Sequence, residues 1–116
     1  MYNGWSDHAI TALGSIKYYE QAIDKMGGRE MVGSFFRLFL VPGMLHCSGG
    51  PGPNVVDYLT ALEEWVETGN PPDYLIASGG DIPGRTRPIC PYPKVAVWNE
   101  VGNPDDAASF SCQEPE

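Results

Sequence analysis

The fold is decided by residues 36–47, Phe-Arg-Leu-Phe-Leu-Val-Pro-Gly-Met-Leu-His-Cys. Apart from one arginine, Phe36–Val41 is apolar without alternation, which predicts a strand buried on both faces, as in a parallel sheet. Pro42-Gly43 ends this strand in a tight turn, and His46 follows at once. A stiff strand that ends in a turn can hold a side chain at the edge of a sheet, where catalytic histidines are often found. We therefore consider His46 a candidate general base.

Helices are predicted on both sides of this segment. The first begins at the N-cap Thr11 and ends at Gly27-Gly28. Its apolar side chains recur with helical spacing at Ala12, Ile16, Tyr19, Ile23 and Met26. The second is predicted to begin at the cap Asn54 and to end at Gly69, and short strands are predicted at Tyr74–Ala77 and Lys94–Trp98. This order indicates an α/β fold with a parallel or mixed sheet and helices on its faces.

Length and charge limit the classes of function. The 116 residues suffice for one small domain, and no internal segment resembles a linker. A net charge of −8 argues against binding nucleic acid or anionic membranes through bulk electrostatics. No apolar run approaches the roughly 20 residues of a membrane-spanning helix. The start of the chain lacks the pattern of a signal peptide, so we expect either a cytosolic protein or a chain without its natural front end.

The chain has three cysteines, an odd number. Cys90 and Cys112 flank a segment that could form a hairpin or closed loop, which favours a disulfide between them. Cys47 would then need a partner on another chain or segment. The alternative is three buried thiols in a reducing compartment.

Asp7 is the group that could work with His46. It lies in the turn before the first predicted helix, where an aspartate ordinarily caps the turn. The helix between the two residues would bring both loops to the same edge of a parallel sheet. An aspartate that accepts a hydrogen bond from one imidazole nitrogen fixes the tautomer and leaves the other nitrogen to act as a base. The alternatives are a capping Asp7 and a loop histidine satisfied by backbone groups.

No nucleophile accompanies this pair. Cys47 is adjacent to His46, and neighbouring side chains on an extended loop point apart. No Gly-x-Ser-x-Gly elbow is present. A metal site built from Asp7, His8, His46 and Cys47 has no supporting spacing. Gly49-Gly50-Pro51-Gly52 lacks the Lys-Ser/Thr ending of a phosphate-binding loop.

Four parts of the sequence are specific enough to compare with known families. The first is Gly4–Asp7 with Tyr18-Tyr19, and the second is Phe35–Cys47 with Gly49-Gly50. The third is Ala61-Leu62 with Trp65–Glu67, Gly69 and Pro71-Pro72. The fourth is Arg85–Pro88 with Cys90–Pro93 and Ser109–Cys112. In these parts, and over nearly its whole length, the chain resembles the C-terminal portion of the tannase and feruloyl esterase family. That family also contains a mono(2-hydroxyethyl) terephthalate hydrolase.

The resemblance implies a fold and a set of site residues. Residues 1–116 would form the C-terminal part of an α/β-hydrolase domain, with mostly parallel strands, flanking helices and long Gly/Pro-rich loops. Asp7 and His46 would be the acid and base of a Ser-His-Asp triad. Cys90 and Cys112 would form a C-terminal disulfide, and Cys47 would pair with a cysteine that precedes the nucleophilic serine, outside this chain. Ile10 would lie near the acyl pocket, at a position that is often aromatic in the family.

The same resemblance implies a secreted or periplasmic serine carboxylic ester hydrolase acting on phenolic or aromatic-acid esters. Its serine elbow, oxyanion hole, lid and lid calcium site would all lie upstream of Met1, so no cofactor is expected in this chain. The partner would be the missing N-terminal half, and the chain alone would be inactive.

Two other functions remain open. The first is a non-catalytic binding or assembly module derived from such an esterase, which self-associates through an exposed sheet edge, with Cys47 pairing across a dimer. The second is an independent cysteine hydrolase that uses Cys47.

Overall fold

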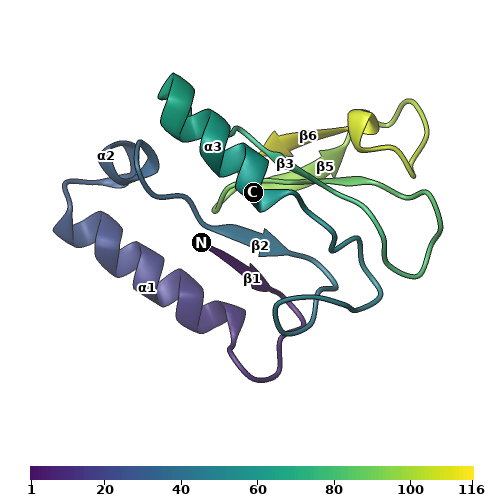
Figure 1. Ribbon diagram of the computed structural model, residues 1–116, viewed down its shortest axis with the longest axis horizontal. Coiled ribbons are helices and arrows are strands. Elements are labelled where there is room, and N and C mark those ends of the chain that lie inside the picture. The colour runs from purple at the N-terminus through teal and green to yellow at the C-terminus, as the bar shows by residue number, and fades with distance from the viewer.

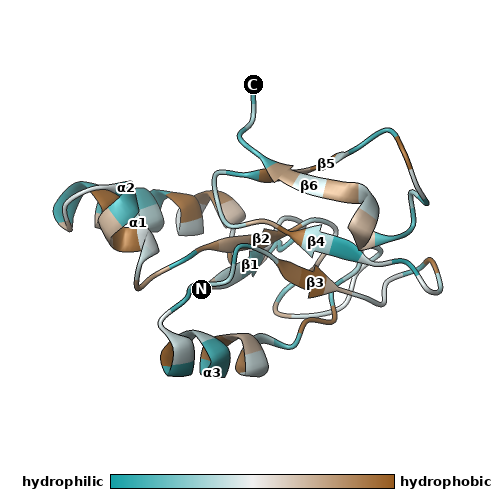
Figure 2. Ribbon diagram, turned by 90° about the horizontal axis from the view of Figure 1, so that it is seen from above, coloured by the Kyte–Doolittle hydropathy of each residue, from teal (hydrophilic) through white to brown (hydrophobic).

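The computed structural model describes residues 1–116. Its elements in chain order are β1 (Tyr2–Gly4), α1 (Ala12–Lys25), α2 (Arg29–Gly33), β2 (Phe39–Val41), α3 (Tyr58–Thr68), β3 (Leu75–Ala77), β4 (Arg87–Ile89), β5 (Val95–Trp98), a 3-10 turn (Ala107–Ser109) and β6 (Phe110–Gln113). Strands β1 and β2 lie at the centre, with α1 and α3 on opposite sides of them (Figures 1 and 2). None of the helices combines the length and apolar character needed to cross a membrane.

Strand β2 is buried on both faces, as its sequence predicts. Phe39 and Val41 belong to a core cluster completed by β3, β4 and one side of α3. Leu40 lies on the other face, in a second cluster with Leu38 and residues of α1 and α2. The strand is shorter than the predicted Phe36–Val41, because residues 34–36 continue the turn that ends α2; the amide of Phe36, for example, donates to the carbonyl of Val32 (2.8 Å).

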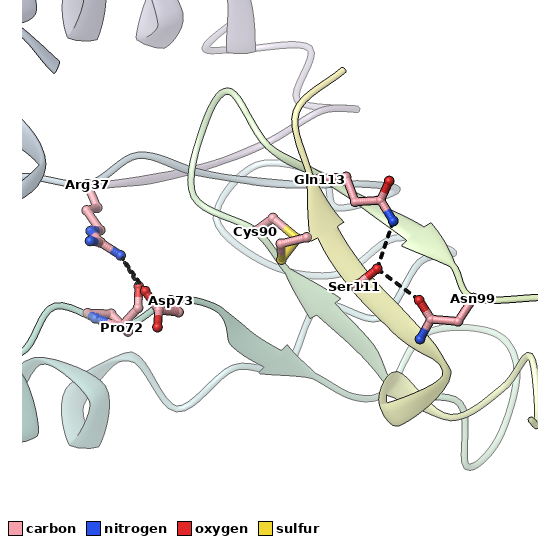
Figure 3. The surroundings of a disulfide bond; sticks show 8 residues. Arg37, Pro72, Asp73, Cys90, Asn99, Ser111 and Gln113 are labelled. Carbon is pink, nitrogen blue, oxygen red and sulfur yellow. Dashed lines mark hydrogen bonds and ion pairs between the residues drawn. A yellow bond between two sulfur atoms is a disulfide. The ribbon is translucent and has the colours of Figure 1, made fainter. Parts of the chain in front are cut away.

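Arg37, the one charged residue of the predicted strand, does not enter the core. Its guanidinium donates to the carbonyl oxygens of Gly33 (3.1 Å) and Pro72 (2.6 Å) and lies 3.6 Å from the carboxylate of Asp73 (Figure 3). It therefore ties the start of β2 to the segment that follows α3.

The strands form three separate pairs, of which only one is parallel. β1 and β2 are parallel, with Tyr2 opposite Phe39 and Gly4 opposite Val41. β3 pairs with β4, and β5 with β6, in antiparallel fashion. The expectation of mostly parallel strands is therefore wrong. Parallel neighbours need a long crossover, usually a helix, and only α1 and α2 supply one; the connections at 78–86 and 99–109 contain no α-helix.

The helix boundaries follow local capping. The hydroxyl of Thr11 accepts from the amide of Leu13 (3.3 Å), which confirms the predicted start of α1. Helix α3 begins later than predicted, because Asp57, and not Asn54, is its cap; the Asp57 carboxylate accepts from the amide (3.0 Å) and hydroxyl (2.8 Å) of Thr60. Gly69, in the left-handed conformation with φ of 76°, ends α3 as expected.

The C-terminal tail forms a strand that was not predicted. β6 pairs with β5, and the disulfide between Cys90 and Cys112 joins it to the end of β4 (Figure 3). The predicted disulfide is thus confirmed, and the alternative of three buried thiols is wrong, since Cys47 is free and exposed.

Candidate active site

The site lies where the parallel strands β1 and β2 end. Backbone hydrogen bonds join the two following loops: the amide of Trp5 donates to Val41 (3.0 Å), and that of Ser6 to Met44 (3.1 Å). Gly4 permits this close approach, because a Cβ atom there would overlap the carbonyl oxygens of Met44 and Leu45. The two loops are therefore held backbone against backbone, which fixes the side chains they carry.

Asp7 and His46 face each other across these loops. Nδ1 of His46 lies 2.8 Å from Oδ2 of Asp7. The second carboxylate oxygen, Oδ1, accepts hydrogen bonds from the amides of Ala9 (2.8 Å) and Ile10 (2.9 Å). Asp7 thus caps its own turn and also contacts the histidine, so the two interpretations of this residue are compatible.

The pKa of Asp7 is lowered to about 2. The main cause is the hydrogen bond from the Ile10 amide, with further contributions from the His46 side chain and the Ala9 amide, while desolvation opposes them. The Asp7 side chain is only 3% exposed. At neutral pH it is therefore a carboxylate, which makes Nδ1 of His46 the donor in their hydrogen bond.

The depressed pKa predicts how Asp7 contributes to stability as the pH changes. A carboxyl whose folded pKa lies below its ordinary value of 3.8 stabilises the fold above that value and loses this effect as the pH falls toward about 2. The difference in unfolding free energy between the wild type and Asp7→Asn should therefore shrink as the pH falls below about 4. Urea unfolding would measure this difference, and a ¹³C NMR titration of the carboxyl carbon would give the pKa directly. A carboxyl that titrates near pH 4 would contradict the prediction.

His46 presents its other nitrogen to solvent. Its side chain is 50% exposed, and Nε2 forms no hydrogen bond within the chain. No serine hydroxyl bonds to the ring; Ser48 is linked to His46 only through its amide, which donates to the His46 carbonyl (2.8 Å). The pair can accept a proton at Nε2, but its hydrogen bonds within this chain include no nucleophile.

The other predicted residues are placed as follows. Ile10 contributes its amide to Asp7, and its side chain is on the surface, since the residue is 56% exposed. His8 is exposed and does not join the pair. Cys47 is exposed and free, in the left-handed region with φ of 63°. No three metal-ligating side chains converge anywhere in the structure.

Sequence reasoning missed two asparagines that organise the site. Asn3 is buried under the Asp7 turn and donates to the carbonyl of Ile10 (3.1 Å). Asn54 accepts from the amide of Gly49 (2.9 Å), within the loop that carries His46. The signal for Asn54 is its place after a Gly/Pro-rich loop, where asparagine often bonds to nearby backbone, but the same place is also typical of a helix cap.

Comparison with known proteins places these features in a wider group. The chain matches the family model described as "Tannase and feruloyl esterase" over residues 1–113. It is 45% identical over 120 residues to the mono(2-hydroxyethyl) terephthalate hydrolase of Piscinibacter sakaiensis. This alignment covers 99% of the present chain and 19% of the hydrolase. It is 38% identical over 117 residues to a probable feruloyl esterase of Arthroderma benhamiae. This alignment covers 96% of the present chain and 22% of the esterase.

A solved structure gives the same result for the fold. The crystal structure of feruloyl esterase B from Aspergillus oryzae superposes with a TM-score of 0.85 at 28% identity, over 97% of this chain and 26% of that chain. The 116 residues therefore correspond to about a quarter or less of each of these proteins.

Proposed function

This chain belongs to the tannase and feruloyl esterase family, and from this premise we propose that it supplies the general base and its orienting acid to a serine carboxylic ester hydrolase. His46 would be the base and Asp7 the acid. The observation that carries the proposal is the 2.8 Å contact between Nδ1 of His46 and Oδ2 of Asp7, with Nε2 left free. The substrates would be esters of phenolic compounds or aromatic acids.

In the proposed reaction His46 transfers protons and Asp7 stabilises the charge that results. Nε2 takes the proton of a serine hydroxyl as the serine oxygen attacks the ester carbonyl, and the imidazolium then gives this proton to the departing alcohol. A water molecule hydrolyses the acyl-serine in the same way, with Nε2 again taking and returning a proton. The ionised Asp7 holds the ring in the required tautomer and stabilises the imidazolium.

The serine, the oxyanion hole and the partner of Cys47 would be supplied by polypeptide outside these 116 residues. Two features support a large packing surface for it. The outer edge of β1 pairs with no strand. Helix α3 exposes Leu59, Leu62 and Val66, which share one helix face and are 67%, 55% and 77% exposed.

A secreted or periplasmic location is part of the proposal. It is supported by the Cys90–Cys112 disulfide, because such bonds persist mainly in oxidising compartments.

The open edge of β1 and the exposed Cys47 also favour a second candidate, a non-catalytic module that dimerises. Against it, α3 carries Glu63, Glu64 and Glu67 beside its apolar face, and the net charge of −8 makes two copies repel each other. A Cys47-dependent dimer on a non-reducing gel would support this candidate.

The proposal is tested by grafting. We would replace the aligned segment of the Piscinibacter sakaiensis hydrolase with residues 1–116 and assay ester hydrolysis by the graft, its His46→Ala variant and the isolated chain. The graft should be active, and both the variant and the isolated chain should be inactive. Turnover by the isolated chain that depends on His46 would overturn the proposal, and so would a folded graft whose activity survives His46→Ala. Alkylation of Cys47 tests the cysteine-hydrolase alternative. Only that alternative predicts that the isolated chain is active and that alkylation abolishes its activity.

A further inference from the structure

Asn54 bonds three times to the loop that carries His46. Its Oδ1 accepts from the amide of Gly49 (2.9 Å), and its Nδ2 donates to the carbonyl oxygens of Gly52 (2.8 Å) and Gly50 (3.3 Å). One side chain thus contacts three backbone positions within the Gly/Pro-rich segment.

Backbone bonds also hold this loop. The amide of Ser6 donates to Met44 (3.1 Å), that of Asp81 to Pro51 (3.0 Å) and that of Gly52 to Gly43 (3.3 Å), and the bond from Leu45 to Gly49 (3.0 Å) closes the turn that contains His46. Apart from the bond between Asp7 and His46, all side-chain hydrogen bonds to residues 43–52 come from Asn54. The imidazole therefore lies in a turn that follows the buried Met44 and is closed by polar bonds, to which the Asn54 side chain contributes three.

Asn54 is itself anchored to the sheet. Its amide donates to the carbonyl of Ser78 (2.9 Å), and Val55 and Ser78 form a two-way antiparallel bridge, with both hydrogen bonds 3.0 Å long, directly after β3. The Asn54 backbone is thus fixed to the core, while its side chain extends to the loop. This arrangement transmits the rigidity of the sheet to the turn that carries the base.

We propose that Asn54 is a positioning residue for His46: by tying Gly49, Gly50 and Gly52 to the end of β3, it keeps Nδ1 on the Asp7 carboxylate and Nε2 accessible. The effect of Asn54 on catalysis rests on the proposed function. The effect of Asn54 on the tautomer and orientation of the imidazole does not, because it can be observed in this chain without any nucleophile.

The test uses NMR of the 116-residue chain. It has two histidines, and His8→Gln leaves one imidazole to observe. In the wild type, ring ¹⁵N shifts should show the tautomer protonated at Nδ1, with a slowly exchanging Nδ1 proton, and both features should be lost in Asp7→Asn. Asn54→Ala should increase the exchange rate of that proton at least tenfold and mix the tautomers. Asn54→Asp keeps the acceptor for Gly49 but sets a carboxylate oxygen against the carbonyl oxygens of Gly50 and Gly52, so it should change the imidazole signals in the same direction.

Asn103→Ala is the matched control. Asn103 Oδ1 also accepts a nearby backbone amide, that of Asp105 (2.9 Å), in a loop that makes no bond to the site. It should leave the imidazole signals unchanged. In the active graft, Asn54→Ala should lower kcat about 10- to 100-fold with little change in KM, as expected for a misplaced base.

The outcomes separate the two proposals. Wild-type imidazole signals in a folded Asn54→Ala variant would overturn the role of Asn54, and if this variant does not fold, the same signals in Asn54→Asp would do so. Absence of the Asp7-dependent tautomer from the wild type would instead overturn the pairing on which the proposed function depends.

Discussion

Asp7→Asn should lower kcat of the active graft by about 10⁴-fold while leaving KM nearly unchanged. Asparagine keeps one oxygen for the amides of Ala9 and Ile10, so the turn should remain intact. Its amide nitrogen would face Nδ1 of His46 and, as a donor, would favour the tautomer that carries its proton on Nε2. A ring protonated at Nε2 cannot take a proton from serine. Measurement of kcat and KM for Asp7→Asn and Asp7→Ala would separate the tautomer effect from loss of the turn.

Asp57→Asn provides the control for this substitution. Asp57 also accepts a backbone amide at the start of a helix, that of Thr60, but it forms no bond to the site. Asparagine is an equally good helix cap, so activity should be retained. If Asp7→Asn kept more than about a tenth of the wild-type kcat, the carboxylate would not be needed to set the tautomer, and His46 would require another orienting group.

The pairing of Asp7 with His46 could be predicted because it follows from local rules. An apolar run with one arginine identified β2, and a capped helical stripe identified α1. One helical crossover between two strands makes them parallel neighbours whose ends meet at one edge. The structure has this arrangement, with β1 beside β2 and the two side chains in contact.

The strands that were missed depend on pairing with a neighbouring strand rather than on a sequence pattern of their own. Strand β4 contains a proline, and β6 lies in an acidic tail, so neither has a strand pattern of its own. Both exist because the preceding strand supplies hydrogen bonds, β3 to β4 and β5 to β6. The bonds of Asn54 are local, to glycines two to five residues before it, but the same position in the sequence is equally typical of a helix cap.

Loss of the Cys90–Cys112 disulfide should reduce the free energy of unfolding by about 3 kcal/mol. The bond closes a loop across a sequence separation of 22, which restricts the unfolded chain. It also anchors a hairpin in which no residue of β5 is buried. The connection between β5 and β6 is tied to the residues before β4 by the Arg85–Asp105 ion pair (2.6 Å) and two hydrogen bonds with Thr86, but the strands themselves are not. Arg87, whose guanidinium lies 4.4 Å from the ring of Phe110, is one of the few remaining contacts between this hairpin and β4. A two-stranded hairpin is marginally stable by itself.

The experiment compares Cys90→Ala/Cys112→Ala with its parent, both carrying Cys47→Ser so that the exposed thiol cannot exchange with the disulfide. Alanine is suited to the buried Cys90 site, 6% exposed, because it adds no hydroxyl that would need a partner. Urea unfolding gives the free energy, and amide hydrogen exchange shows where protection is lost. We expect faster exchange in β5 and β6 and near-wild-type exchange in β1 and β2, so that the Asp7–His46 pair outlasts the hairpin. Uniform loss of protection across all strands would show instead that the disulfide stabilises the whole domain as one unit, with the site included.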